Sequence, residues 1–376
     1  MTQQGFLLIA DITGYTMFLT QSELEHAQGI LDALLKSVLA EIKAPLALSN
    51  LQGDAVLAYL PASSQPQPQY PLDAIEGIYC GFVDTLQSMQ RNTTCSCNAC
   101  RNIKVLDLKF FLHYGAYATQ AIAGRTELQG SEVIRLHRLL KNTVTKTTGI
   151  RAYALVTKAA ADAIALPEFF AAAVRHVERS DDFGETDGYV YDLEPVFARW
   201  HAARRIVVAR DEPLCFESME CDLPVPPAIA WAYMTDVEKK IRWQQGLDGM
   251  TMSGLSRGRV GAGSIQHCAH GKNTTLHDIV DWRPFDYVTY HIRTPLGTVV
   301  RQTAELTPLA NGGTHVSLRS ARPESSNSVA QAVIRMMMPL VAAKQVPLQR
   351  ASKVALEKLV AGDIAASANT AEPAPL

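Results

Sequence analysis

FLLIADITGYT, residues 6–16, joins a short apolar run to an aspartate and a glycine turn. The run Phe6–Ala10 predicts a buried strand, and Asp11 stands where that strand is expected to end. Gly14 permits a tight turn whose free backbone N–H groups can face phosphate oxygens beside a metal held by Asp11. The stretch therefore predicts a divalent-metal site at the end of the first strand.

A second carboxylate has a similar setting in LQGDAVLAY, residues 51–59, where Asp54 precedes an apolar strand. Two aspartates on neighbouring strand ends are a common way to hold Mg²⁺ or Mn²⁺ for phosphoryl chemistry. The alternative interpretation is two buried hairpin strands with Gly–Asp turns and no metal.

The order and spacing of these two motifs resemble those of a known family. ADITGYT followed by GDAVLAY, with a helix between them, is similar to the two metal-aspartate motifs of the class III adenylate/guanylate cyclase catalytic domain. The resemblance implies a ferredoxin-like domain over residues 1–200, Mg²⁺ or Mn²⁺ at Asp11 and Asp54, and a head-to-tail homodimer. The residues that it places beside a nucleotide triphosphate are Gly14, Tyr15 and Thr16.

The match to the cyclase site is incomplete. GSEVIRLHRLLKN, residues 130–142, resembles the cyclase helix that carries an asparagine and an arginine. On this resemblance Arg138 is the phosphate-contacting arginine, whereas the asparagine position holds Ile134. The purine-selecting pair of the family falls on Asn50 and Glu127. Because an apolar side chain cannot replace an amide in hydrogen bonding, we expect metal and nucleotide binding without efficient cyclase turnover.

A cysteine-rich loop, RNTTCSCNACRNI at residues 91–103, predicts a second metal site. Its thiols are Cys95, Cys97 and Cys100. Three thiolates this close form a plausible clamp for tetrahedral Zn²⁺, with Cys80 or His113 as the fourth ligand. The alternatives are reduced cysteines in a loop, or a redox or iron–sulfur role. Seven cysteines in this arrangement do not indicate a secreted disulfide framework.

Length and charge limit the remaining possibilities. The 376 residues predict two or three domains, and 35 basic against 37 acidic side chains give a net charge of −2. We therefore expect no nucleic acid partner. The N-terminus lacks a basic signal region, and no apolar run approaches the ~18 residues of a spanning helix. The expected location is cytoplasmic, without a membrane span.

The second half of the chain has a different pattern. A strand at Cys215–Leu223, then PVPPAIAWAYMTD, resembles the opening of START-like (SRPBCC) helix-grip domains, which include polyketide cyclases and Bet v 1-like proteins. The resemblance covers residues 213–362 and implies an apolar ligand cavity between a curved sheet and a long helix, Ser325–Val360. The residues expected to line the cavity are Trp231, Trp243, Tyr290, Val333, Met336 and Met337. Residues 363–376 are expected to be a disordered tail.

These patterns predict an α+β protein with a cyclase-homology domain and a helix-grip domain. The leading functional hypothesis is a two-domain sensor or binding protein for an apolar small molecule. One alternative is an active metal-dependent nucleotidyl cyclase, or another phosphoryl-transfer enzyme, regulated by the second domain. Another is a polyketide cyclase or aromatase. The histidines that could serve such an enzyme as acid or base are His267, His270, His277 and His291.

Overall fold

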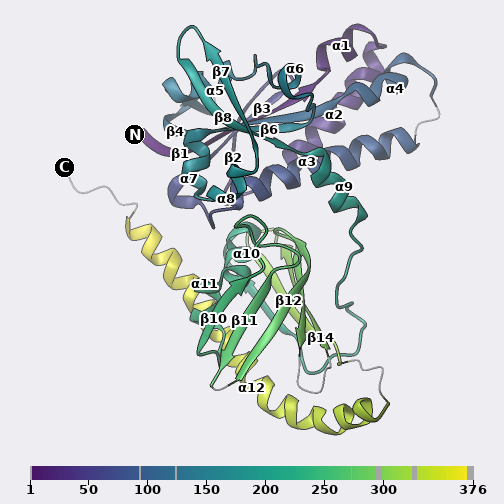
Figure 1. Ribbon diagram of the computed structural model, residues 1–376, viewed down its shortest axis with the longest axis vertical. Coiled ribbons are helices and arrows are strands. Elements are labelled where there is room, and N and C mark those ends of the chain that lie inside the picture. Colours follow the sequence, from purple (N-terminus) through teal and green to yellow (C-terminus); the bar gives the residue numbers. More distant parts are fainter. Residues whose placement is uncertain are drawn as a thin grey trace. The chain divides into compact units, whose positions relative to one another are not determined.

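The computed structural model describes residues 2–92, 95–122, 125–271, 273–293, 299–323 and 328–370. The chain divides into two compact units, residues 1–204 and residues 205–376. Each unit combines helices with its own sheet, so the expected α+β class is confirmed (Figure 1). Within these described ranges, no helix is long and apolar enough to cross a membrane.

The N-terminal unit is built on one mixed sheet with the strand order β2-β3-β1-β4-β6-β8-β7, and β5 pairs with β4. In this sheet β1 lies between β3 and β4 and is antiparallel to both, whereas β4 and β6 are parallel. The strands are β1 (Thr2–Thr13), β2 (Ala47–Gln52), β3 (Ala55–Pro61), β4 (Asp107–Ile122), β5 (Arg125–Gln129), β6 (Tyr153–Thr157), β7 (Val174–Ser180) and β8 (Gly184–Asp192).

Helices pack on this sheet through their apolar sides. Leu7 and Ile9 of β1 share a core cluster with Val133 and Leu136 of α5, and α2 packs against α3. The helices are α1 (Tyr15–Thr20), α2 (Leu24–Glu41), α3 (Tyr70–Asn92), α4 (Asn98–Asn102), α5 (Ser131–Arg138), α6 (Val144–Thr148), α7 (Lys158–Ile164), α8 (Pro167–Ala171) and α9 (Glu194–Ala202). Two 3₁₀ turns are η1 (Ala62–Ser64) and η2 (Ile103–Val105).

The first strand is longer than the sequence predicts. It continues past Ala10 to Thr13 because β4 pairs with it from end to end. Asp11 therefore lies inside the paired strand rather than after it, opposite Ala55 of β3 and Lys109 of β4. Side chains of both neighbouring strands can reach it for that reason.

The C-terminal unit has an antiparallel sheet with the order β10-β11-β12-β13-β14-β15-β9. Its core joins Trp231 and Trp243 to Tyr290 of the sheet and to Leu356 and Val360 of the last helix. The elements are β9 (Met219–Leu223), α10 (Pro227–Thr235), α11 (Val237–Trp243), β10 (Gly249–Ser253), β11 (Ile265–His270), β12 (Asn273–Arg283), β13 (Tyr287–Arg293), β14 (Val299–Pro308), β15 (Thr314–Ser320) and α12 (Ser328–Thr370).

Helix α12 corrects the expectation of a disordered tail after Gly362. It continues past Val360 through residues 363–370, so this part of the expected tail is helical. Residues 324–327, which the prediction placed in this helix from Ser325 onward, and residues 371–376 lie outside the described part. Pro339 and Pro347 lie inside the helix, which changes direction along its length in Figure 1, as prolines that remove backbone hydrogen bonds require.

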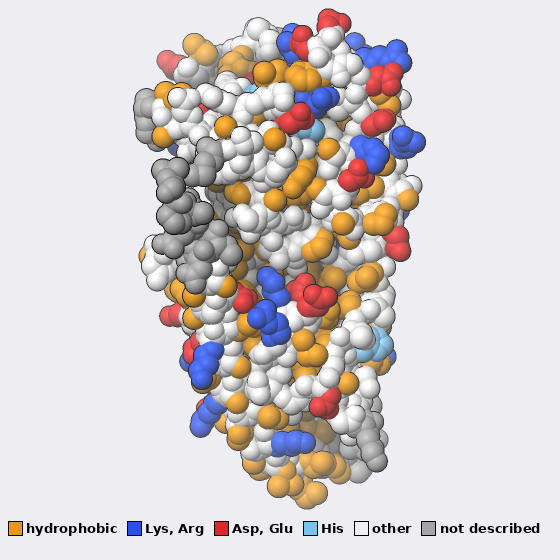
Figure 2. All heavy atoms as spheres, turned by 90° about the vertical axis from the view of Figure 1, so that its left-hand side faces the viewer, with side chains coloured by type: hydrophobic (Ala, Val, Ile, Leu, Met, Phe, Trp, Pro, Cys, Tyr) orange, Lys and Arg blue, Asp and Glu red, His pale blue; other side chains and the backbone are white. Residues whose placement is uncertain are grey.

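The first half of α12 does not form the expected cavity wall. Met336 is 74% exposed and Met337 is 45% exposed, and Leu340 and Val341 are exposed beside them. Val333 is half-buried. Figure 2 shows hydrophobic side chains at the lower end of the view, the height at which α12 begins in Figure 1. The methionines therefore belong to an exposed apolar surface.

The second unit begins earlier than the predicted residue 213. Ile206 N donates a hydrogen bond to Asp281 Oδ2 (2.8 Å), and Val208 N donates to Thr303 Oγ1 (2.9 Å). Arg319 Nε in turn donates to Val208 O (3.1 Å). The segment from residue 205 onward is therefore part of the C-terminal fold, because buried polar side chains of the sheet use its backbone as their partner.

Candidate functional site

The two predicted metal aspartates lie close together at the end of β1. Ile12 N donates a hydrogen bond to Asp54 O (3.3 Å), which holds the β2–β3 turn beside β1. Burial raises the pKa of Asp11. Burial and, secondly, the charge of Asp11 raise the pKa of Asp54. The negative charge of Asp11 thus disfavours a second negative charge at Asp54, which favours a cation beside the pair.

The sequence analysis missed the cation that already faces this pair. Lys109 Nζ lies 3.0 Å from Asp11 Oδ2, and both side chains are mostly buried. Lys109 stands in an otherwise apolar part of β4, so only the strand register could have indicated the contact. Its ammonium lowers the pKa of Asp11 against the larger effect of burial.

The predicted phosphate-facing residues follow directly after β1. Gly14 has a φ of 84° and precedes α1. A Cβ at this position would lie 2.7 Å from Val105 O, so both the backbone angle and the space require glycine. Tyr15 and Thr16 form the start of α1, with Tyr15 half-buried and Thr16 exposed.

The two residues at the base-selecting positions are in contact. Asn50 Nδ2 of β2 donates a 2.5 Å hydrogen bond to Glu127 Oε2 of β5. Ser49 Oγ donates to Thr126 O (2.7 Å) beside it, so the two strands are held together at this point.

Arg138 and Ile134 have surface positions on α5. Arg138 forms a 2.5 Å ion pair with Asp182, and both side chains are about half exposed. Ile134 is 52% exposed. Among the described residues, the ion-pair partner of Arg138 is therefore Asp182 rather than either metal aspartate.

His113, one of the two residues expected to complete a zinc site, is engaged elsewhere. Its Nε2 lies 2.6 Å from Glu132 Oε2, and its Nδ1 lies 2.9 Å from Thr157 Oγ1. Burial lowers the pKa of His113. Arg135 Nε also donates to Glu132 (3.1 Å), so the histidine belongs to a buried network that ties β4 to α5.

The cysteine-rich loop meets a histidine that the sequence analysis did not select. His26, in the first turn of α2, lies with its Nδ1 3.2 Å from Cys97 Sγ and 3.7 Å from Cys95 Sγ. Ligand atoms of these three residues and Cys100 all lie within 4.8 Å of one another. Cys80 is buried in α3 and is not part of this group. No sequence spacing links His26 to the loop, because α2 and α3 intervene.

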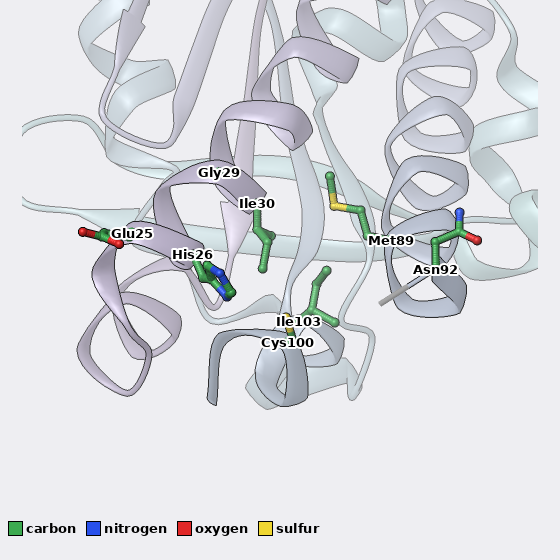
Figure 3. A pocket seen from close by; sticks show the side chains of 8 residues that line it. All are labelled: Glu25, His26, Gly29, Ile30, Met89, Asn92, Cys100 and Ile103. Carbon is green, nitrogen blue, oxygen red and sulfur yellow. The ribbon is translucent and has the colours of Figure 1, made fainter. Parts of the chain in front are cut away.

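The Cys95/Cys97/Cys100/His26 group borders a pocket of about 410 Å³. Figure 3 shows His26 and Cys100 on one side and Met89 and Asn92 on the other. The remaining lining residues are Glu25, Gly29, Ile30 and Ile103. Solvent and small reagents therefore have access to the group, which includes the exposed Cys95.

A buried lysine marks the interior of the C-terminal unit. Lys240 of α11 is 5% exposed, and its Nζ donates to Gln266 Oε1 (3.1 Å) and lies 4.6 Å from the centre of the Tyr290 ring. Burial lowers the pKa of Lys240 to about 8. The sequence of α11, VEKKIRW, is typical of a charged surface helix, and nothing in it distinguishes Lys240 from Lys239.

Polar groups around Lys240 have few partners. Gln266 Nε2 and Tyr290 Oη are buried and have no hydrogen-bond partner in the parts of the chain that the structure describes. The Gln266 side chain lies near enough to lower the pKa of Tyr290 against the effect of burial, although the two atoms form no hydrogen bond of normal geometry. Both atoms are donors, as is the ammonium.

The predicted acid–base histidines divide into two kinds. His277 is buried with its Nδ1 3.9 Å from Cys268 Sγ, and burial lowers the pKa of His277 to about 3. His267 and His270 lie near the edge of the sheet, bonded to Ser253 Oγ and Gly246 O, both at 2.6 Å. Burial lowers the pKa of the half-buried His291. The charge of Lys240 lowers the pKa of His277 further.

Comparisons with known proteins match the two halves separately. Residues 31–148 match the family model described as "Protein of unknown function (DUF2652)", and residues 218–369 match "Polyketide cyclase / dehydrase and lipid transport". A curated relative, the uncharacterized protein Rv2561/Rv2562 of Mycobacterium tuberculosis, is 31% identical over 111 residues, or 30% of this chain. The chain covers about half (51%) of that relative.

Solved structures similar to the chain include nucleotidyl cyclases. The guanylyl cyclase Cya2 is 12% identical, with a TM-score of 0.40 over 52% of this chain and 95% of its own. The adenylyl cyclase CyaB from P. aeruginosa is 13% identical, with a TM-score of 0.34 over 51% and 95%. A Nitrosospira multiformis protein is 11% identical, with a TM-score of 0.29 over 38% and 93%. The two family-model matches thus fall in different units, residues 31–148 in the N-terminal unit and residues 218–369 in the C-terminal unit.

Proposed function

We propose that the protein is a two-domain binding protein whose C-terminal unit holds a small molecule with an apolar body and an electron-rich end, such as a carboxylate or a carbonyl. The N-terminal unit binds a metal–nucleotide complex weakly and turns it over poorly. The observation that carries the proposal is Lys240, a buried ammonium inside an apolar core.

A buried ammonium is costly unless it is paired. Transfer of a charge out of water is repaid only by a close counter-charge and further hydrogen bonds. Lys240 has one amide oxygen and one ring face, and among the described residues no carboxylate forms an ion pair with it. Such an arrangement is expected where a ligand supplies the missing acceptor.

The neighbours of Lys240 support the same chemistry. The unpartnered atoms, Gln266 Nε2 and Tyr290 Oη, are hydrogen-bond donors. Three donors on neighbouring side chains of an apolar core suit an acceptor group on a mostly apolar molecule. The match of residues 218–369 to a family that includes lipid transport is compatible with that ligand class.

Binding is favoured over catalysis at this site. Burial raises the pKa of Cys268, so its thiol stays protonated and is a poor nucleophile. His277, with a pKa of about 3, stays neutral and has little tendency to take up a proton. Neither residue has the environment of an activated nucleophile or base.

A matched pair of fluorescent probes tests the proposal in the full chain. Anilinonaphthalene sulfonate and N-phenylnaphthylamine share an apolar ring system, but only the first carries an anion. We expect the protein to bind both, with Lys240→Met weakening the anionic probe roughly tenfold or more and leaving the neutral one unchanged. Lys239→Met removes the neighbouring charge and is the control. Equal loss of both probes, or the same loss in both variants, would contradict the assignment.

The nucleotide part of the proposal rests on Asp11, Asp54 and the Asn50–Glu127 pair. The aspartates provide oxygen ligands for Mg²⁺ or Mn²⁺, and Arg138 of a second copy provides a phosphate contact. Ile134 cannot orient a ribose, and loss of positioning commonly costs on the order of 10² in rate. Weak nucleotide binding with little cyclase activity is therefore the expected behaviour.

A further inference from the structure

We propose that Cys95, Cys97, Cys100 and His26 form a zinc site. In a tetrahedral site with Zn–S bonds of about 2.3 Å, neighbouring ligand atoms lie roughly 3.5 to 3.8 Å apart. The distances from His26 Nδ1 to Cys97 Sγ and Cys95 Sγ, 3.2 and 3.7 Å, are close to that range. All four ligand atoms lie within 4.8 Å of one another, so small side-chain rotations complete the tetrahedron.

The ligand set selects the metal. Three thiolates and one imidazole are soft and borderline donors that suit Zn²⁺ and exclude Mg²⁺ or Ca²⁺. With four protein ligands there is no open position, which is typical of a structural site. The site is chemically independent of the aspartate pair, whose oxygen ligands suit a hard cation.

The four proposed ligands come from two segments that are distant in sequence. His26 comes from the start of α2, whereas the cysteines lie in and before α4, after α3. Glu23 already joins these regions, because its carboxylate accepts hydrogen bonds from Asn98 N (3.1 Å) and Ala99 N (3.0 Å). A metal at the Cys95/Cys97/Cys100/His26 group adds a second link between the start of α2 and the connection that leads into β4.

The linked segments are connected in sequence to the residues of the aspartate site. The segment α1–α2 follows Asp11 directly, and β4 carries Lys109. A zinc ion that fixes the start of α2 relative to the α3–β4 connection therefore stabilises both segments next to Asp11. We expect metal loss to lower the melting temperature of the N-terminal unit, because zinc-binding free energy contributes directly to folding.

Elemental analysis of the full chain, purified without chelator or added metal, is the first experiment. We expect one zinc per chain, lost in Cys97→Ser and strongly reduced in His26→Ala. Glu25→Ala, on the same turn of α2, and Cys215→Ser, in the other unit, are matched controls that should keep the metal. Zinc near zero in the wild-type protein, or zinc retained in both Cys97→Ser and His26→Ala, overturns the proposal.

A second experiment does not depend on the folding of variants. Titration of the wild-type protein with a mercurial thiol reagent should release zinc in proportion to the blocked thiols, as read by a metal-sensitive dye. Co²⁺ exchanged into the protein should show thiolate charge-transfer bands and the visible bands of tetrahedral coordination. Octahedral cobalt spectra, a disulfide among the three cysteines with no metal, or iron with sulfide in place of zinc each count against the assignment.

Discussion

Replacing Lys240 with methionine should make the protein more stable while it weakens ligand binding. Methionine keeps the length of the side chain and removes the charge. The pKa of Lys240 falls from 10.5 to about 8 on folding, which corresponds to a cost of about 3 kcal/mol for the buried charged form. Methionine cannot make the hydrogen bond from Lys240 to Gln266, and this loss offsets about 1 kcal/mol of the stability gained by removing the charge. We expect a net gain of about 2 kcal/mol near pH 7.

The pH dependence gives a sharper test of the same cost. The folded state disfavours the proton on Lys240, so the penalty is fully present below about pH 8 and decreases as pH rises toward 10.5. Wild-type stability should gain about 1 kcal/mol between about pH 7 and pH 9 from this group, and Lys240→Met should lack that gain. Cys268, His277 and Tyr290 lie beside this position in both proteins, and, besides the larger effect of burial, the charge of Lys240 lowers the pKa of Cys268 and of His277. The difference between the two proteins therefore reports Lys240 together with its effect on these neighbours.

Urea unfolding followed by tryptophan fluorescence measures both effects, since Trp231, Trp243 and Trp282 lie in the C-terminal unit. Lys239→Met should change the free energy of unfolding by less than about 0.5 kcal/mol. A Lys240→Met protein that is less stable than wild type at every pH would refute the reasoning, because the lysine would then be a structural partner. A stabilisation by removal of a binding residue is the usual trade-off at functional sites.

Three further predictions concern the N-terminal unit. Asp54→Ala should abolish Mn²⁺-dependent nucleotide binding measured by calorimetry, and robust formation of cyclic nucleotide by the wild-type protein would contradict the proposed function. Lys109→Met should raise Mn²⁺ affinity roughly tenfold, because a unit charge about 3 Å from Asp11 competes with the metal; unchanged affinity would place the metal elsewhere. Glu132→Gln should lower the free energy of unfolding by about 1 to 3 kcal/mol, since Arg135 loses its ion pair and His113 its charged acceptor; Glu185→Gln, in an exposed ion pair with Arg179, should change it little.

Much of the fold was accessible from the sequence because apolar periodicity is a local signal. The strand that contains Phe6–Ala10, the strand that follows Asp54 and the strand that ends at Leu223 all follow such patterns. Strand β7 was not predicted, since VRHVERS is an edge strand in which Val174 and Val177 are exposed and His176 is buried, so it lacks the usual alternation of apolar buried and polar exposed residues. The length of α12 was underestimated because its alanine-rich end has little amphipathic pattern to distinguish a helix from a polar tail.

Candidate site residues could be selected from the sequence only where they are near in sequence or carried by a resemblance. The cysteines were found because they are crowded into one loop, and Asn50 with Glu127 because the cyclase resemblance paired them. Lys109 was missed because its partner comes from strand register. His26 and Lys240 were missed because burial and proximity across helices leave no trace in spacing.

The backbone at Ile206 and Val208 has a practical consequence for cutting the chain in two. Asp281 and Thr303 are almost completely buried, and each accepts a backbone N–H from this segment. A C-terminal fragment that starts at Pro213 leaves both acceptors, and the Arg319 donor, without these partners, at about 1 to 3 kcal/mol for each buried group. A fragment that starts at Arg205 keeps all three bonds, so a limited-proteolysis cleavage site should fall before Arg205 and not between Val208 and Pro213.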